Sequence, residues 1–313
     1  MDVLAIGEPL LEFSTADDRP LDEAGRFSRG FGGDTSNFVV AARRSGAAAG
    51  YITRLGDDAF GDAFVRLWES EDIDTTHVTR EAGGRTGIYF ISRDAARSAF
   101  TYYRADSAAS RLAPGDVPDD AIRSAKALHV SGITQAISTS ACDAAFHAMR
   151  VAGGAGALVS YDPNYRPALW APDRARAVVT RSVELSDIAL PNVEEGRILT
   201  DLDEPAAILK WFADLGPRIV VLKMGAQGCL LWYDGQVTEV PPHPVTPVDS
   251  TGAGDAFDGA FVARLVEGVS PPEAARYAAV AGALTTQGHG AVHPIPHRDV
   301  ILSVLRKDTT PHV

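Results

Sequence analysis

The sequence predicts an α/β fold, in which a doubly wound and mostly parallel sheet is flanked by helices. From about residue 125 onward, short β-branched runs alternate with amphipathic helical segments, and this alternation is typical of parallel sheets. Several glycine-rich turns directly follow the predicted strands. Hydrophobic residues make up 45% of the 313 residues, which is enough for a large buried core. Since no linker or repeat divides the chain, we expect one main domain over residues 1–313.

The first quarter of the chain contains further expected strands and helices. The sequence opens on a short apolar run that is typical of a buried strand. A glycine-rich segment then precedes an apolar helical pattern, whose first residues include the capping types Asp and Thr. The elements expected here are a strand at 3–6, a helix capped by Asp34 or Thr35 that ends before Gly46, a strand at 50–53 and an amphipathic helix at 57–71.

Two early segments, at about 10–31 and 85–104, predict a small second β layer. Within the later segment, the runs 87–91 and 99–103 are aromatic and β-branched, and polar residues separate them. This pattern predicts a hairpin. We therefore expect the two segments to leave the main sheet and to form a small β lid.

The second half of the chain consists of repeated strand–helix units. Ligands of doubly wound sheets bind at the carboxyl ends of the strands, so polar motifs that directly follow strands are the candidate site. The expected strands are 127–130, 157–161, 188–190, 219–223 and 229–233, and the expected helices include 139–151, 171–185 and 204–215.

Composition excludes several classes of function. The net charge of −12 and a pI near 5.1 argue against nucleic acid or an anionic membrane as partner, because both require clustered Lys and Arg. Cys142 and Cys229 lie far apart, so neither a disulfide framework nor a structural zinc site is expected. The sequence shows no secretion signal and no apolar stretch of membrane-spanning length. We therefore expect a cytoplasmic protein.

The strongest chemical signal is the run Asp-Ser-Thr-Gly-Ala-Gly-Asp at 249–255, which leads into an apolar helix at 256–265. Free N–H groups at a helix start form an anion site, and glycine lets a phosphate approach the backbone closely. A carboxylate in the first turn, Asp255, is placed to take a proton from a hydroxyl beside that phosphate. The run therefore suits phosphoryl transfer to an alcohol.

Other interpretations of this run are weaker. It lacks the Gly-Lys-[Ser/Thr] of a P-loop, and Phe257 stands where the third glycine of a dinucleotide fingerprint belongs. A tight turn capped by Asp255, without any function, is the plain alternative for Gly-Ala-Gly-Asp taken alone. The longer run at 249–262 is much more specific than those four residues.

Four motifs together resemble the PfkB family of carbohydrate kinases, which has a ribokinase-like fold. The run 249–262 resembles the family's C-terminal signature, and 30–46 resembles its N-terminal one. Asn-Val-Glu-Glu at 192–195 resembles the Asn-x-x-Glu motif, and 223–228 resembles the strand and loop that contact ATP phosphates. The motifs occur in the family's order and span nearly the whole chain.

The resemblance implies ATP and Mg²⁺ as cofactors and assigns roles to residues. Asp255 is the general base, and the amides of Gly252, Ala253 and Gly254 hold the γ-phosphate. Glu195, with Asn192, helps to place Mg²⁺ through water. The loop at 288–291 approaches adenine, and some relatives bind a monovalent cation near the position of Asp249. The implied nucleotide contacts are Asn164, Asn192, Lys223, Gly225, Gly228, Gly252 and Gly254.

The acceptor predicted from the sequence is a sugar acid. Two arginines near one predicted pocket, Arg104 and Arg166, suit a carboxylate, because guanidinium groups pair with it in a bidentate way. Within the family, the surrounding segments resemble 2-keto-3-deoxygluconate kinases, which make the 6-phosphate of a 3-deoxy-2-keto sugar acid. Of two adjacent tyrosines, Tyr103 rather than Tyr102 is expected to face the sugar. The implied substrate contacts are Gly33, Asp34, Asn37, Tyr89, Tyr103, Arg104, Arg166 and Asp255.

Two alternatives remain open at this point. One is another kinase of this family, acting on fructose, ribose or a nucleoside. The other is a sugar-binding protein on the same fold without catalysis, which the intact anion site and Asp255 disfavour. Exposed lid strands need partners, so we also expect a homodimer that forms through the lid.

Overall fold

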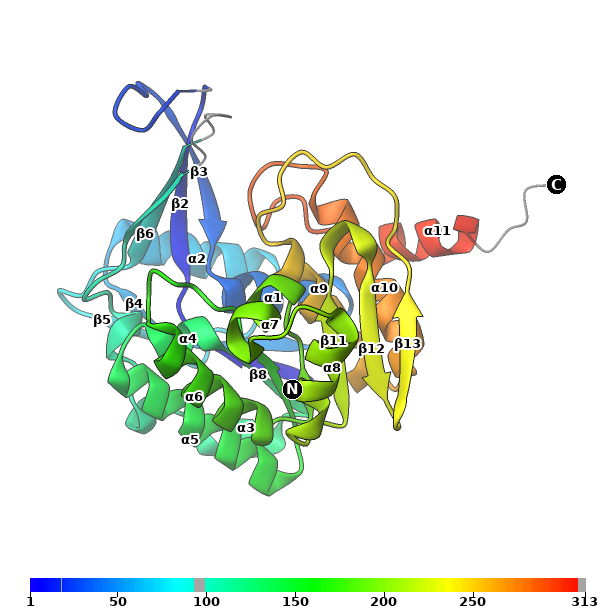
Figure 1. The fold of residues 1–313 in the computed structure, drawn as a ribbon. Helices are drawn as coiled ribbons and strands as arrows, with labels where there is room; N and C mark the ends of the chain where they lie inside the picture. Colours follow the sequence, from blue (N-terminus) through cyan, green and yellow to red (C-terminus); the bar gives the residue numbers. More distant parts are fainter. Residues whose placement is uncertain (18, 93–98, 309–313) are drawn as a thin grey trace.

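Residues 1–17, 19–92 and 99–308 are described in the computed structural model of the chain, and they form two sheets (Figure 1). Neighbouring strands of the main sheet pair parallel, except that the second-to-last strand in sequence pairs antiparallel with the strand on each side of it. In spatial order the main sheet contains β13 (Gln236–Val240), β12 (Cys229–Tyr233), β11 (Ile219–Lys223), β10 (Ile188–Ala189), β9 (Leu158–Asp162), β8 (Ala127–Ser131), β1 (Val3–Ile6), β4 (Ala49–Gly56) and β5 (Val78–Glu81).

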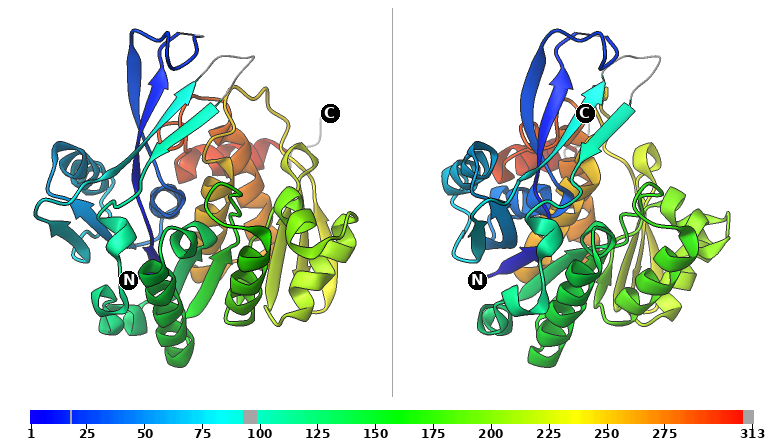
Figure 2. Two further views of the ribbon diagram at one scale, coloured as in Figure 1. Left: turned by 60° about the vertical axis from the view of Figure 1, so that its left-hand side comes forward. Right: turned by 90° about the vertical axis from the view of Figure 1, so that its left-hand side faces the viewer.

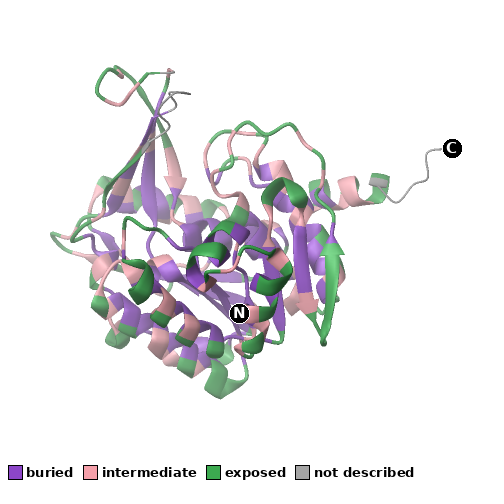
Figure 3. Cartoon of the chain, in the orientation of Figure 1, coloured by how far each residue is buried: buried purple, intermediate pink, exposed green. Residues whose placement is uncertain are grey.

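Helices cover both faces of this sheet, and the buried residues concentrate between the layers (Figures 1 and 3). The predicted α/β class with a doubly wound, mostly parallel sheet is therefore confirmed. None of the helices in the described ranges is long and apolar enough to cross a membrane. One core includes α1 (Asp34–Arg44), α2 (Ala59–Ser70), α9 (Ala253–Val266), α10 (Pro271–Thr285) and α11 (Arg298–Asp308); the other includes α3 (Asp119–Ser124), α4 (Gly132–Ala136), α5 (Thr139–Ala155), α6 (Pro172–Glu184), α7 (Val193–Thr200) and α8 (Pro205–Asp214).

The second sheet is built from the two early segments. In spatial order its strands are β3 (Phe27–Gly32), β2 (Leu10–Thr15), β6 (Gly87–Ser92) and β7 (Ala99–Tyr103). The expected hairpin corresponds to β6 and β7, which pair antiparallel, and the polar residues 93–98 between them lie outside the described residues. Figures 1 and 2 show these strands rising away from the main sheet at one side of the molecule.

The start of α1 differs from the prediction. Gly33, with a φ of 94°, is the N-cap, and Asp34 is already the first helical residue. The expectation that Asp34 or Thr35 caps the helix is therefore wrong, and no side chain caps it. Both side chains are buried, because they face the interior of the protein at the candidate site rather than the helix end.

Some elements of the structure were not among those expected from the sequence. They are the edge strands β5 and β13 and the helices α10 and α11.

A close contact between α1 and α9 brings the two ends of the sequence together. Gly259 on α9 lies against the backbone of α1, so that a Cβ there would fall on the carbonyl oxygen of Phe38 and 2.8 Å from the Cβ of Ala41. Only a residue without a side chain permits this approach. The contact places Asn37 of α1 beside Asp255 of α9.

Replacing Gly259 by alanine should therefore destabilise the fold. We expect Gly259→Ala to lower the free energy of unfolding by about 1–3 kcal/mol, because the added methyl overpacks the contact with α1. Urea unfolding followed by circular dichroism measures this difference.

The matched control is Gly153→Ala near the end of α5, where a Cβ meets nothing within 4 Å. This substitution should raise stability by up to about 1 kcal/mol, since alanine is the better helix former. Equal stabilities of the two variants would contradict the assigned role of Gly259.

Candidate active site

The N-terminus of α9 forms the centre of the candidate site. Gly252 is the N-cap, with a φ of 76°, and a Cβ there would lie 2.8 Å from the carbonyl oxygen of Ala291. The amides of the first helical turn have no preceding carbonyl to bond, so those of Gly254 and Asp255 are available to an anion. The amide of Ala253 instead donates to the carbonyl of Ser250 at 3.2 Å, so two of the three amides expected to hold a phosphate are available.

Asp255 has the environment of a general base. Its Oδ2 accepts a hydrogen bond from Nδ2 of Asn37 at 2.8 Å. Burial and the neighbouring carboxylate of Asp34 raise the pKa of Asp255 to about 7, although Asn37 and Lys223 favour the charged form. A carboxylate with a pKa near neutrality is well matched to accept a proton at physiological pH.

The start of α1 offers unused acceptors next to this base. Nδ2 of Asn164 donates to Oδ2 of Asp34 at 3.3 Å. Oδ1 of Asp34 and Oδ1 of Asn37 are buried without a hydrogen-bond partner among the described residues. Buried polar atoms are normally satisfied, so these two oxygens fit a ligand that supplies hydroxyl donors. Asn164 thus lies on the hydroxyl-binding side of the site, whereas the resemblance implied that it contacts ATP.

The lid contributes an aromatic wall on one face of β6 and β7. The ring of Tyr89 stacks with that of Tyr102 at a centroid distance of 5.7 Å, and Tyr89 donates to Oε2 of Glu12 at 2.7 Å. Tyr103 lies on the opposite face, where it meets Phe90, and it is 64% exposed. Successive residues of a strand point to opposite faces. The expectation that Tyr103 faces the pocket is therefore corrected to Tyr102.

The two expected carboxylate-binding arginines have different surroundings. Nε of Arg104 donates to Oε2 of Glu8 at 2.7 Å, and Ser107 donates to the other oxygen of this fully buried carboxylate at 2.5 Å. Arg166 is about half exposed and contacts Glu195 only at 3.4 Å. Arg104 is thus already engaged by a protein carboxylate, and Arg166 is the more available guanidinium.

A mostly apolar cavity of about 550 Å³ opens beside the anion site. The turn after β11 and the small residues of α10 form its walls, and a proline-rich segment at 242–247 covers it. Its size and apolar lining suit a nucleotide base and ribose. The predicted nucleotide residues on this cavity are Lys223, Gly225, Gly228 and Gly254.

Asn192 and Glu195 form a reciprocal cap at the start of α7. The amide of Glu195 donates to Oδ1 of Asn192 at 2.9 Å, and Oε2 of Glu195 accepts the Asn192 amide at 3.5 Å. Glu195 is buried, and burial together with Asp162 raises the pKa of Glu195 to about 8.

The neighbouring carboxylates of Glu195 and Asp162 suit Mg²⁺, a hard cation that takes oxygen ligands and keeps several waters. In the described part of the chain, no group of three or more His, Cys, Asp or Glu side chains forms a metal cage. This donor set therefore fits an ion that is also held by phosphates and water.

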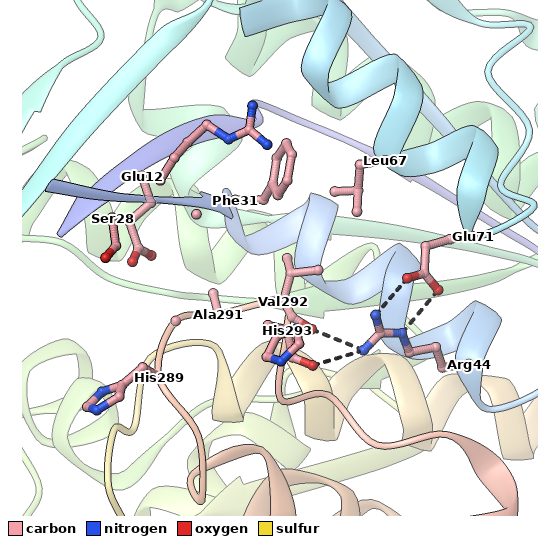
Figure 4. A pocket seen from close by; sticks show the side chains of 13 residues that line it. Glu12, Ser28, Phe31, Arg44, Leu67, Glu71, His289, Ala291, Val292 and His293 are labelled. Atoms are coloured by element: carbon pink, nitrogen blue, oxygen red, sulfur yellow. Dashed lines mark hydrogen bonds and ion pairs between the residues drawn. The ribbon is translucent and has the colours of Figure 1, made fainter. Parts of the chain in front are cut away.

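A second cavity, of about 560 Å³, lies between β3 of the lid, α2 and the loop at 289–293 (Figure 4). The loop predicted to approach adenine lines this cavity and is absent from the lining of the apolar one. Arg44 holds the loop in place through carbonyls of Val292 and Ile295, at 3.1 and 2.6 Å, while it pairs with Glu71. Asp249 accepts the Gly290 amide at 2.9 Å, so the predicted cation position also lies at this loop.

Four buried carboxylates of the site were missed by sequence reasoning. Glu8 and Asp162 directly follow or end strands of the main sheet, and the rule for ligands at carboxyl ends could have found them. Asp258 lies three residues after Asp255, on the same side of α9. Glu12 gave no signal, because its inward direction depends on the pairing register of β2.

The chain is similar in sequence and in fold to known carbohydrate kinases. Residues 1–298 match the family model described as pfkB family carbohydrate kinase. The chain is 35% identical to the 2-dehydro-3-deoxygluconokinase of Thermoproteus tenax, covering 94% of this chain and 91% of that protein. It is 33% identical to probable fructokinase-2 of Arabidopsis thaliana, covering 97% and 95%. A crystal structure of fructokinase from Vibrio cholerae, with fructose, ADP and calcium bound, superimposes with a TM-score of 0.86 at 27% identity, covering 97% and 98%.

The two tyrosines of β7 provide a direct test of the site geometry. We expect Tyr102→Ala to lower kcat/KM for the hydroxyl-bearing substrate about tenfold, because the stacked wall beside Tyr89 is lost. Tyr103→Ala removes a ring of the same size from the other face of the strand and should have a smaller effect. Steady-state kinetics of both variants measure this, and a larger loss for Tyr103→Ala would contradict the face assignment.

Proposed function

Since this chain belongs to the pfkB family of carbohydrate kinases, we propose that it transfers the γ-phosphoryl group of ATP to 2-keto-3-deoxygluconate. The product is 2-keto-3-deoxy-6-phosphogluconate. One observation carries the proposal: the Asp255 carboxylate lies between the unused acceptors of α1 and the amides that face the apolar cavity. A base that adjoins both a hydroxyl site and an anion site is what phosphoryl transfer to an alcohol needs.

In this mechanism the protein positions the reactants and stabilises charge. Asp34 and Asn37 bind sugar hydroxyls through their free oxygens, and Asp255 accepts the proton of the terminal hydroxyl as it attacks. Backbone amides of the first turn of α9 stabilise the charge on the transferred group. Closure of the lid over the sugar excludes water and so limits ATP hydrolysis.

Nucleotide and metal binding are assigned to neighbouring parts of the site. The apolar cavity takes adenine and ribose, with Gly225 and Gly228 at the phosphates. Glu195 would hold Mg²⁺ through water, with Asn192 orienting the start of α7. The ion would supply positive charge that offsets the charge of the nucleotide phosphates.

A sugar acid is the acceptor that best uses Arg166. This guanidinium is half exposed near Asp255 and Asp34, where a substrate carboxylate can pair with it. Arg104 supports the same wall through Glu8 and through its contact with the face of Tyr102, at 5.7 Å. The 35% identity to a 2-dehydro-3-deoxygluconokinase supports the choice.

Fructose is the second candidate acceptor. Because Glu8 already neutralises Arg104, the site presents one available guanidinium instead of two. The similar identity to a probable fructokinase supports this alternative. A homodimer is also part of the proposal, with the exposed lid side chain Tyr103, which lies on the face away from Tyr102, at its interface.

The pH dependence of kcat/KM tests Asp255 as the base. Only the ionised carboxylate can accept a proton, so kcat/KM should fall about tenfold per pH unit below pH 7 and level off above it. Asp255→Asn should lower kcat about 10²–10⁴-fold with little change in the KM for ATP. A variant that keeps most of the activity would remove Asp255 from the mechanism.

A coupled ADP-release assay over a panel of sugars and sugar acids tests the acceptor. We expect 2-keto-3-deoxygluconate to give the highest kcat/KM. Arg166→Gln should lower that value about 10–100-fold, because a charge-assisted pair is lost, and should spare any residual activity on fructose. Highest efficiency with fructose would establish the alternative acceptor. An unchanged kcat/KM for the acid in Arg166→Gln would remove Arg166 from its recognition.

A further inference from the structure

A buried cluster of three charges lies beneath the anion site. Nζ of Lys223 donates to Oδ1 and Oδ2 of Asp258, each at 2.9 Å, and to Oδ2 of Asp162 at 3.1 Å. Both carboxylates are almost fully buried, and the lysine side chain is 12% exposed. Neither the proton transfer nor the nucleotide cavity described above accounts for Asp258.

The ends of two parallel strands position this cluster. Lys223 ends β11 and Asp162 ends β9, on either side of the short strand β10. The chain continues beside β11 after β10, since the amide of Lys223 donates to the carbonyl of Pro191 at 2.9 Å. The Lys223 side chain reaches Asp162, and Asp258, from the second turn of α9, joins the cluster from the helix side.

The ammonium lies next to the phosphate-binding turn. A Cβ placed on Gly254 would be 3.7 Å from Nζ of Lys223, and Lys223 and Gly254 both line the apolar cavity. At this distance a positive charge acts on any anion held by the first amides of α9. A free lysine side chain adopts many conformations, so two carboxylate anchors restrict it to this position.

We propose that Asp258 is a positioning residue, which with Asp162 holds the Lys223 ammonium beneath the phosphate-binding turn so that its charge stabilises the transferred phosphoryl group. The inference rests on the proposed phosphoryl transfer. Burial alone would lower the pKa of Lys223, but the two carboxylates raise it above the ordinary value and keep the ammonium charged. Removal of either carboxylate would leave part of the buried charge of Lys223 uncompensated, which is usually costly.

Chemical labelling tests the position of Lys223 without any substrate. The chain has four lysines, at 126, 210, 223 and 307. Lys126 and Lys210 are more than half exposed and serve as internal standards. Acetylation followed by peptide mass spectrometry should leave Lys223 largely unmodified in the wild type. In Asp258→Ala its rate should rise at least about fivefold relative to Lys126, and an unchanged rate would overturn the proposal.

Kinetics test the consequence for catalysis. Asp258→Ala should lower kcat about tenfold or more, with the KM for the sugar changed less than about twofold, because Lys223 loses its position while the sugar contacts remain. Asp258→Asn keeps one acceptor oxygen, so its kcat should lie between that of the wild type and that of Asp258→Ala. In the Lys223→Met background, Asp258→Ala should cause no further loss beyond about twofold. A kcat near the wild-type value, or losses that simply add, would overturn the proposal.

The pH profile separates positioning from a purely structural role. The charged groups facing Asp255 include Asp34 on α1, Asp162 at the end of β9, Arg166 and Lys223, and the two cations favour the ionised base. Lys223→Met should shift the acid limb of kcat/KM to higher pH, because a cation that favours the ionised base is lost. Asp258→Asn also removes a negative charge near Asp255, which opposes such a shift, so a positioning role predicts a lowered kcat with a smaller shift of the limb than in Lys223→Met. A folded Asp258→Asn variant with an unmoved limb and an unmoved kcat would leave Asp258 only a structural role.

Failure of the two proposals can be told apart. If the wild type phosphorylates no sugar of the panel, the proposed function fails. The labelling rates of Lys223, with and without ATP, still decide whether Asp258 positions it.

Discussion

The close contact between α1 and α9 is the constraint on which the rest of the site depends. Gly259 lets the two helices approach until α9 touches the backbone of α1 at Phe38. On its other side, α9 meets Gly282 of α10, where a Cβ would lie 3.1 Å from the carbonyl oxygen of Ala253. Both close contacts depend on residues without a side chain, Gly259 and Gly282. The contact with α1 brings Asn37 within hydrogen-bond distance of Asp255, although the two residues are 218 positions apart in sequence.

This packing gathers more negative than positive charge at the carboxyl edge of the sheet. Desolvation of the buried carboxylates, with repulsion between them as the second cause, raises the pKa of Asp255 to about 7 and that of Glu195 to about 8. The same crowding therefore produces a base that titrates near neutrality and a donor set that suits a divalent cation. The side chains involved are Asp34, Asp162, Glu195, Asp255 and Asp258, with Arg166 and Lys223 as the nearby cations.

Sequence reasoning placed most of these groups in one site but misjudged how some of them are used. Arg104 was expected to bind a substrate carboxylate, whereas Glu8, from a distant strand end, already pairs with it. Tyr103 was chosen over Tyr102, although alternation alone says only that one of the two faces the pocket. The direction was decided by the register of β7 against β6, in which Tyr102 lies opposite Tyr89.

The sequence by itself determined the α/β class and pointed to Asp255, with its glycine turn, as the candidate base. The position of the polar motifs directly after the strands was also predictable, because hydrophobic periodicity and the free amides of a helix N-terminus are local properties of the sequence. Only the tertiary structure decided which side chains remain available to a ligand. Glu8 engages Arg104, and Asp162 with Asp258 engages Lys223, through contacts between residues 35 to 96 positions apart. Such pairings depend on how helices and strand ends come together, and no local pattern encodes them.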